Sequence, residues 1–215
     1  MALTKFNFNS FDLTTAANTG IAFNASANGL TTAEGGALNL ITTNTISSGV
    51  SSSDFTSGID STYNTYLFKF FNMHPATNNT DFQFQGSING GSSYGVTITS
   101  TNFNAYHNEA DSQTNLAYQS GDDLAQSTSF QETQPNLSAD SDHGITGFLY
   151  LFNPSGTTFV KHFVSRFSSV HEADYAFDIY VAGYFNTTSA VNAMQFKMAS
   201  GNIDSGVIKM YGLSK

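Results

Sequence analysis

Aromatic and aliphatic residues recur at every second position along several short stretches of this chain, and this spacing limits the folds open to it. Residues 66–71 read YLFKFF and residues 175–185 read YAFDIYVAGYF. Successive side chains of a β-strand point to opposite faces, so an apolar residue at every second position places all of them on one face, which can be buried. The apolar face of a helix instead repeats about every 3.6 residues. The spacing therefore predicts half-buried strands.

The composition favours the same interpretation. The chain has 20 Phe and 10 Tyr but only 3 Pro and no Trp among its 215 residues, and aromatic side chains pack well on pleated, half-buried surfaces. Charged residues make up 11% of the chain, against about 25% in an average soluble protein, so neutral polar side chains must supply most of the surface. A chain of this length fits one domain, or one domain with an arm.

Turn residues divide the chain from Tyr63 onward into about eight to ten strands, with no helical period. The pattern weakens between Asn102 and Gly144, which suggests surface loops there. The nearly continuous apolar stretch 145–152 is typical of a strand covered on both faces. The predicted fold is all-β, an antiparallel β-sandwich for which we expect a jelly-roll topology. The expected strands or extended segments are 66–71, 82–84, 94–98, 116–118, 127–130, 145–152, 157–167, 175–185, 191–198 and 207–210.

The first 60 residues differ from the rest because they are rich in Thr, Ser, Asn, Ala and Gly and hold few bulky side chains after Phe11. Residues 37–41, ALNLI, fit one short strand. We therefore predict an extended N-terminal arm over residues 1–60 and a β-sandwich domain over residues 61–215. Ordering a backbone costs about 1–2 kcal/mol per residue, so such an arm either packs on a subunit surface or stays a flexible leader, and the sequence leaves both open.

The last stretch, 190–213, reads AVNAMQFKMASGNIDSGVIKMYGL and predicts two strands joined by a tight turn, a closing hairpin. Met194, Phe196 and Met198 fall on one side of the first strand. The turn SGNIDSG supplies glycine and Asx residues that take positive φ at low cost.

This ending resembles that of β-sandwich structural proteins of tailed bacteriophages, which often close on an SGNI turn, a short strand and Tyr-Gly-Ile or Tyr-Gly-Leu. The matching residues here are Ser200 to Ile203, Gly206 and Tyr211 to Leu213, and a looser likeness runs through residues 66–70, 82–94 and 148–154. The resemblance spans roughly residues 66 to 213 and names no site.

The resemblance implies a virion component: a tail or head fibre, an appendage or a capsid decoration protein. It further implies a homo-oligomer, most simply a trimer, that binds capsid or tail proteins and contacts a glycan of the host surface. Such a protein is made in the host cytoplasm and resides in the virion.

The charge balance excludes several functional classes. A formal net charge of −9 and a pI near 4.6 argue against nucleic-acid binding, which rests on Lys and Arg. Most basic residues lie in the last quarter of the chain, where they either face an acidic partner or protect strand edges. Without cysteine the chain can form no disulfide and no thiolate metal site. We expect no signal peptide and no membrane insertion, because the N-terminus MALTKFNFNS and the hydropathy pattern fit neither.

Four polar fragments were weighed as chemical sites, and none predicts one. His107-Asn-Glu109 has the H-x-E form of zinc deaminases but lacks their cysteines. Asp140-Ser-Asp-His143 and His171-Glu-Ala-Asp174 gather metal-ligand types in predicted loops, where such residues commonly cap turns. Asp122-Asp123 offers paired carboxylates, but neighbours on a strand point to opposite faces. We therefore expect no enzyme activity, no catalytic residue, no cofactor and no metal.

Tyrosines suggest an alternative function. Tyr94, Tyr106 and Tyr118 lie in or beside the polar region between Asn102 and Gly144, and exposed Tyr can stack on sugars, although core packing is its usual role in a β protein. The alternative to a virion protein is thus a non-catalytic carbohydrate-binding module or lectin.

Overall fold

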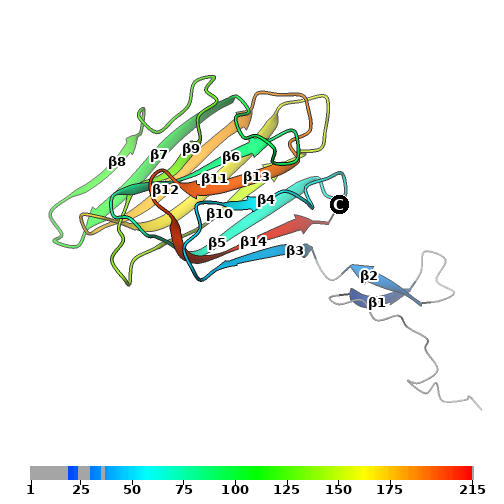
Figure 1. Ribbon diagram of the computed structural model, residues 1–215, viewed down its shortest axis with the longest axis horizontal. Helices are drawn as coiled ribbons and strands as arrows, with labels where there is room; N and C mark the ends of the chain where they lie inside the picture. The colour runs from blue at the N-terminus through cyan, green and yellow to red at the C-terminus, as the bar shows by residue number, and fades with distance from the viewer. Residues whose placement is uncertain (1–18, 24–29, 35–36, 215) are drawn as a thin grey trace, which may run out of the picture.

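Every regular element among the described residues is a β-strand, as the aromatic alternation predicted. The computed structural model describes residues 19–23, 30–34 and 37–214 (Figure 1). These residues contain no helix long and apolar enough to cross a membrane. The strands are β1 (Thr19–Phe23), β2 (Leu30–Glu34), β3 (Leu38–Ile46), β4 (Ser53–Phe55), β5 (Thr65–Pro75), β6 (Thr80–Ser87), β7 (Ile98–Asn108), β8 (Thr114–Tyr118), β9 (Gln131–Leu137), β10 (Ile145–Phe152), β11 (Lys161–His171), β12 (Tyr175–Phe185), β13 (Ala193–Met198) and β14 (Ile203–Leu213).

Twelve of the strands form two antiparallel layers. The large sheet has the order β3-β14-β5-β10-β11-β12-β7-β8, and the small sheet has the order β9-β6-β13-β4. The two sheets meet at a single pair, His171 on β11 with Leu137 on β9. In Figure 1, β3 and β8 lie at opposite ends of the large sheet.

The pairing is that of a jelly roll. The first strands of the sandwich pair with the last ones, β3 with β14 and β4 with β13. Strands further inward in the sequence continue this nesting: β5 pairs with β14 and β10, and β6 pairs with β13 and β9. This gives two four-stranded sheets, β3-β14-β5-β10 and β4-β13-β6-β9, the arrangement of a double-sheet jelly roll. The predicted fold class, an antiparallel β-sandwich of jelly-roll type, is confirmed.

Two insertions widen one of these sheets. Strands β7 and β8 lie in the sequence between β6 and β9, and β11 and β12 lie between β10 and β13. Together they extend the large sheet beyond β10 in the order β11-β12-β7-β8. The sequence between Asn102 and Gly144 therefore forms strands where mainly loops were expected.

The core is aromatic. Phe70 contacts the rings of Phe82, Phe167 and Phe196, with centroids 5.6, 5.1 and 4.9 Å away. Each of these four side chains is at most 1% exposed. They come from β5, β6, β11 and β13, so the same cluster joins both sheets.

The predicted closing hairpin is wrong. Strand β13 pairs with β6 and β4 in the small sheet, whereas β14 pairs with β3 and β5 in the large sheet. The SGNI turn therefore carries the chain across the sandwich from one sheet to the other. Gly201 has a φ of 70°, and a side chain there would collide with Thr77 in the β5–β6 loop, so glycine suits this crossing both in backbone conformation and in space.

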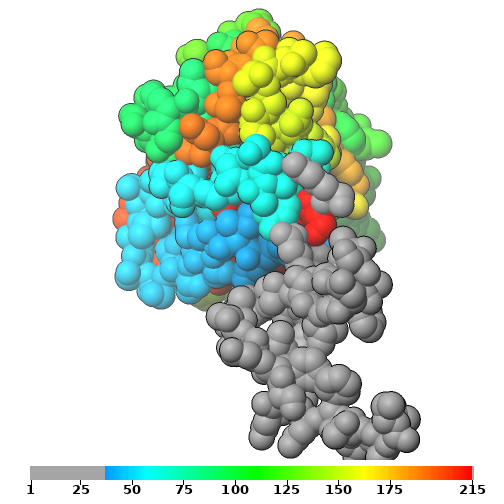
Figure 2. Space-filling model, turned by 90° about the vertical axis from the view of Figure 1, so that its right-hand side faces the viewer, coloured from blue at the N-terminus to red at the C-terminus, as the bar shows by residue number. Residues whose placement is uncertain are grey.

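The sandwich begins before residue 61. Strands β3 and β4, which lie within the predicted arm, are members of the two sheets. In Figure 2 the blue and cyan segments that follow residue 36 pack directly on one another. Strands β1 and β2 pair only with each other, and residues 1–18, 24–29 and 35–36 lie outside the described residues. The arm stays a prediction for the chain before β3.

Candidate functional site

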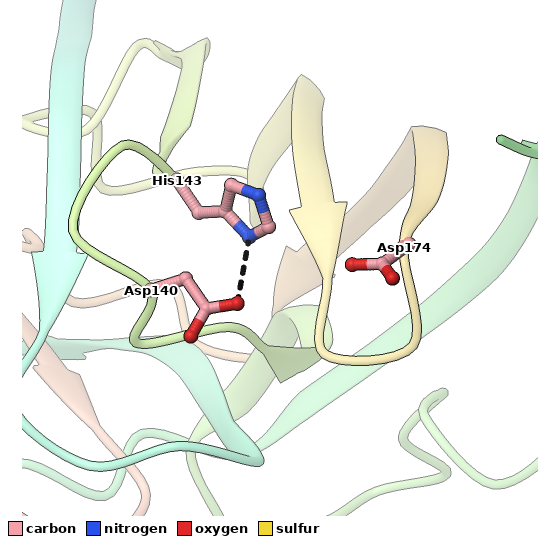
Figure 3. A group of neighbouring side chains, drawn as sticks. All are labelled: Asp140, His143 and Asp174. Carbon is pink, nitrogen blue, oxygen red and sulfur yellow. Dashed lines mark ion pairs between the residues drawn. The ribbon is translucent and has the colours of Figure 1, made fainter.

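Two of the polar fragments that are distant in the sequence come together at one end of the sandwich. Asp140 and His143 lie in the β9–β10 loop, and Asp174 lies in the turn between β11 and β12 (Figure 3). One ligand atom from each of the three side chains lies within 4.8 Å of the others. The jelly-roll connections bring the fragments together although about 30 residues separate them.

Local turn structure accounts for where these side chains sit. The backbone N–H of His143 donates to the carbonyl of Asp140 at 2.9 Å, and the N–H of Asp174 donates to the carbonyl of His171 at 3.0 Å. The N–H of Ala173 donates to His171 Nδ1 at 3.0 Å. Both fragments are therefore tight turns, and in the second the His171 side chain caps the turn by accepting a backbone hydrogen bond.

A second imidazole borders the same region. His74 Nδ1 lies 3.4 Å from a carboxylate oxygen of Asp204, and His74 Nε2 lies 3.2 Å from the Asp140 carbonyl. A depression of about 470 Å³ beside them is lined by His74, Asp142, His143 and Asp204. The end of the sandwich thus combines imidazole and carboxylate groups around an open hollow.

The chemistry of this cluster is that of a weak cation site. Two carboxylates and an imidazole are ligands that Zn²⁺ or Mn²⁺ accepts. His143 Nδ1 is 4.0 Å from Asp140 Oδ2, and its ring is mostly buried. The side chain of Asp140, however, is 70% exposed, so water competes fully for its oxygens and holding it in place costs side-chain entropy.

The other weighed fragments do not assemble into a reaction centre. His107 Nε2 lies 3.0 Å from a carboxylate oxygen of Asp111 on an exposed turn. Asp122 and Asp123 point to different partners, since Asp123 accepts a hydrogen bond from the Tyr118 hydroxyl while Asp122 faces Glu132. Adjacent positions diverge here, as the sequence predicted.

Sequence reasoning missed the carboxyl pair formed by Asp122 and Glu132. Burial, together with the charges of Asp81 and Asp122, raises the pKa of Glu132 to about 7. Burial also raises the pKa of Asp122. The two carboxyls hydrogen-bond each other, which is closer than the roughly 5–9 Å that a pair flanking a sugar bond requires. No sequence signal marks Glu132, because it is a lone acid in a polar strand.

The three tyrosines divide by their surroundings. Tyr106 packs against Phe177 and Tyr175, with ring centroids 5.2 and 5.3 Å away, and Tyr94 is half-buried beside a hollow of about 620 Å³. Burial raises the pKa of Tyr94 to about 12. Tyr118 alone of the three is exposed, at 55%, so its ring offers the largest open surface to a ligand.

The most extensive candidate surface is the outer face of the large sheet, by which we mean the side chains that point away from the small sheet. Of the ten large hydrophobic side chains that stand exposed among the described residues, eight lie on this face. Monomeric proteins rarely expose a continuous apolar patch of more than a few hundred Å². The eight are Leu38, Leu40, Phe71, Phe103, Leu116, Tyr118, Phe152 and Val164.

Flat rings and charged groups share this face. Phe103 stacks on Tyr180 with centroids 4.8 Å apart and planes within 4°. Arg166 lies 4.8 Å above the Tyr180 ring and makes two hydrogen bonds, of 2.8 and 2.7 Å, to the carboxylate of Asp178. These bonds lower the pKa of Asp178, so the Arg166–Asp178 pair stays ionised and contributes no net charge.

Comparisons with protein-family models, with curated proteins and with solved structures found no match. The fold, the surface and the sequence resemblance are therefore the features that bear on function.

Proposed function

We propose that this chain is a non-catalytic structural protein of a tailed-phage virion, a fibre, appendage or capsid decoration protein that acts by assembling with copies of itself and with capsid or tail proteins. The observation that carries this proposal is the outer face of the large sheet. An apolar surface of that extent on a chain with a net charge of −9 serves contact with another macromolecule.

The resemblance to phage proteins supports the location in a particle. Its most specific elements have structural roles here, since Ser200 to Ile203 form the crossing between the sheets and Tyr211 and Leu213 point to the outer face of the large sheet. Jelly rolls occur in viral capsid proteins but also in lectins, so the fold alone does not separate these classes. On this proposal the protein is made in the host cytoplasm, incorporated into the virion and needs no cofactor.

Mass spectrometry of purified phage particles tests the proposal. We expect the intact chain in particles at a fixed copy number relative to the major capsid protein, because a structural component binds a defined number of sites. Absence of the chain from washed particles would overturn the proposal.

The attachment role of the N-terminal segment has its own test. Deleting residues 1–36 leaves β3 and β4 in place, unlike a deletion to residue 60, which removes two strands of the sandwich. We expect the shortened chain to fold and to lose incorporation into particles. Unchanged incorporation would assign attachment to the sandwich instead.

A carbohydrate-binding module is the second candidate, favoured by the Phe103–Tyr180 stack beside the Arg166–Asp178 pair. Planar rings next to hydrogen-bonding groups are a common way to hold sugars. Binding of the isolated monomer to a glycan array, lost in Phe103→Ala, would favour this function over the first.

A further inference from the structure

The apolar pattern of β10 does not match its environment in a single chain. Residues 145–152, ITGFLYLF, have the composition of a strand covered on both faces. The inward-pointing Ile145, Leu149 and Leu151 are fully buried. On the other side Phe148 and Tyr150 are only half-buried and Phe152 is 38% exposed. The sequence of this strand thus predicts that both of its faces are buried, but the described residues bury only the inward face.

Neighbouring strands continue this apolar row, in which Leu67 is already buried by its neighbours while Leu40 and Val164 are exposed. Tyr150 on β10 pairs with Val164 on β11 and, on its other side, with Leu67 on β5. The row continues from Leu67 to Tyr211 on β14 and from there to Leu40 on β3. Directly opposed side chains on one face lie side by side. An apolar line therefore crosses the outer face from β3 to β11.

We propose that a second copy of this chain covers the outer face of the large sheet, with the two large sheets packed face to face. This inference rests on the proposed assembly function and names its partner surface. Two sheets of the same twist pack with their strands within about 30° of each other, and identical sheets have the same twist by construction. A two-fold axis makes such a contact self-complementary.

The area is sufficient for a stable dimer. The eight strands lie about 4.8 Å apart and average at least about 27 Å in length, although β8 is shorter, and they give a face of about 1,000 Å². A standard interface buries about 800 Å² on each partner. The face thus meets this requirement even where its twist leaves the outermost corners uncovered.

The charges on the face are also compatible with its own copy. Lys69 and Lys209 oppose each other on β5 and β14, on the half of the sheet towards β3. On the other half Asp123 is hydrogen-bonded to Tyr118 at the end of β8, and Asp178 on β12 is paired with Arg166 on β11. A two-fold axis along the strands between β10 and β11 sets β5 and β14 of one copy opposite β12 and β7 of the other. It thereby keeps the lysines of the two copies apart and sets them over the half that carries Asp123 and the Arg166–Asp178 pair.

The first test measures the oligomeric state of the purified full chain by sedimentation velocity across micromolar concentrations. Wild type is expected as an oligomer of two copies or more. Val164→Glu places a charge at the centre of the face and is expected to weaken association at least tenfold. Phe159→Glu is the matched control, because Phe159 is 72% exposed but lies in the β10–β11 loop off this face, and it should associate like wild type.

A second measurement does not depend on how Val164→Glu folds. The chain has no cysteine, so Val164→Cys and Phe159→Cys each introduce one thiol. Maleimide should label Cys at 159 at every protein concentration and label Cys at 164 more slowly as concentration rises. A monomeric wild type, equal labelling at both sites, or an oligomer unaffected by Val164→Glu would each overturn the inference.

The outcome is separable from that of the proposed function. A chain found in phage particles but monomeric in solution overturns this interface and leaves the virion assignment intact. An oligomer that uses this face but is absent from particles supports the interface and overturns the virion assignment. A monomer whose thiol at 164 is protected only by added oligosaccharide would overturn the inference in favour of a glycan-binding face.

Discussion

The two halves of the sandwich interior are built from different side chains. Beneath β5 and β10 the interior is an aromatic cluster centred on Phe70 and Phe196. Beneath β7 the inward positions Ser100, Asn102 and Asn104 are polar, yet each is at most 7% exposed. One fold is thus stabilised by ring packing in one half and by hydrogen bonding in the other.

The polar half depends on a small network. The Ser100 hydroxyl donates to Gln131 Oε1 at 2.5 Å, and the Gln119 amide donates to Asn104 Oδ1 at 3.1 Å. Gln131 donates in turn to the carbonyl of Asp122 at 2.9 Å. Buried polar groups stabilise a fold only when they are paired, so the polar half should respond to substitution differently from the aromatic half.

Truncation in the aromatic half should have the largest effect. Phe70→Ala removes ring contacts to Phe82, Phe167 and Phe196 and should lower the free energy of unfolding by about 3–5 kcal/mol. Urea denaturation measures this. The control Phe159→Ala, at a position 72% exposed, should change it by less than about 0.5 kcal/mol. Similar losses for both variants would contradict an aromatic core centred on Phe70.

The carboxyl pair beside the polar half should make stability depend on pH. The folded-state pKa of Glu132, about 7, lies above its ordinary value of 4.5. This group therefore favours the folded state below about pH 4.5 and loses that contribution as the pH rises towards 7. Because Glu132 is only partly buried, we expect Glu132→Gln to stabilise the protein at pH 8 by about 1–2 kcal/mol.

Urea denaturation of the Glu132→Gln variant at pH 4 and pH 8 checks this sign. The stabilisation should be absent at pH 4, where the wild-type carboxyl is already protonated when folded. A variant that is equally stabilised at both pH values would show that the gain is unrelated to titration.

A matched pair of asparagines separates paired from unpaired burial in the polar half. The side-chain amide of Asn102 is fully buried, and neither its oxygen nor its nitrogen has a hydrogen-bond partner among the described residues. Asn102→Val should therefore raise the free energy of unfolding by about 1 kcal/mol. Asn104→Val, which removes a partner of Gln119, should lower it by a similar amount. Thermal denaturation of both variants distinguishes them, and two losses would mean that Asn102 is paired.

The smallest effect is expected from metal ions at the loop cluster. With Asp140 largely exposed, a dissociation constant near 1 mM for Zn²⁺ or Mn²⁺ would give about 0.4 kcal/mol at 1 mM metal, or roughly 1–2 °C in Tm. Differential scanning calorimetry with and without metal measures the shift. A rise of many degrees that His143→Ala abolishes would establish a cation site of real affinity.

The strands of the aromatic half could be predicted from the sequence, whereas strand β7 of the polar half could not. The strands around Phe68, Leu149, Ile179 and Phe196 were predicted because their buried face is apolar and alternates with a polar or half-buried face. Strand β7 was not predicted because Asn and Ser occupy its inward positions. Hydrophobic periodicity cannot detect a buried face made of polar groups.

The candidate sites divide in a similar way. The residues of the loop cluster were noticed as metal-ligand types at 140–143 and 171–174, but their approach depends on two connections of the jelly roll ending side by side. Glu132 had no signal because it is a lone acid in a polar strand. The outer face of the large sheet was signalled only at residues 145–152, because elsewhere an exposed apolar side chain and a buried one look alike in a sequence.

The sequence by itself determined that this protein is built from β-strands, because the period of its apolar residues fixes which face of each strand is buried. Only the tertiary structure decided which strands meet. The segment 190–213 shows why: its alternation and its Gly-rich turn suit a hairpin and a crossing equally well. The choice depends on partners far away in the chain, β6 and β4 for β13 and β3 and β5 for β14.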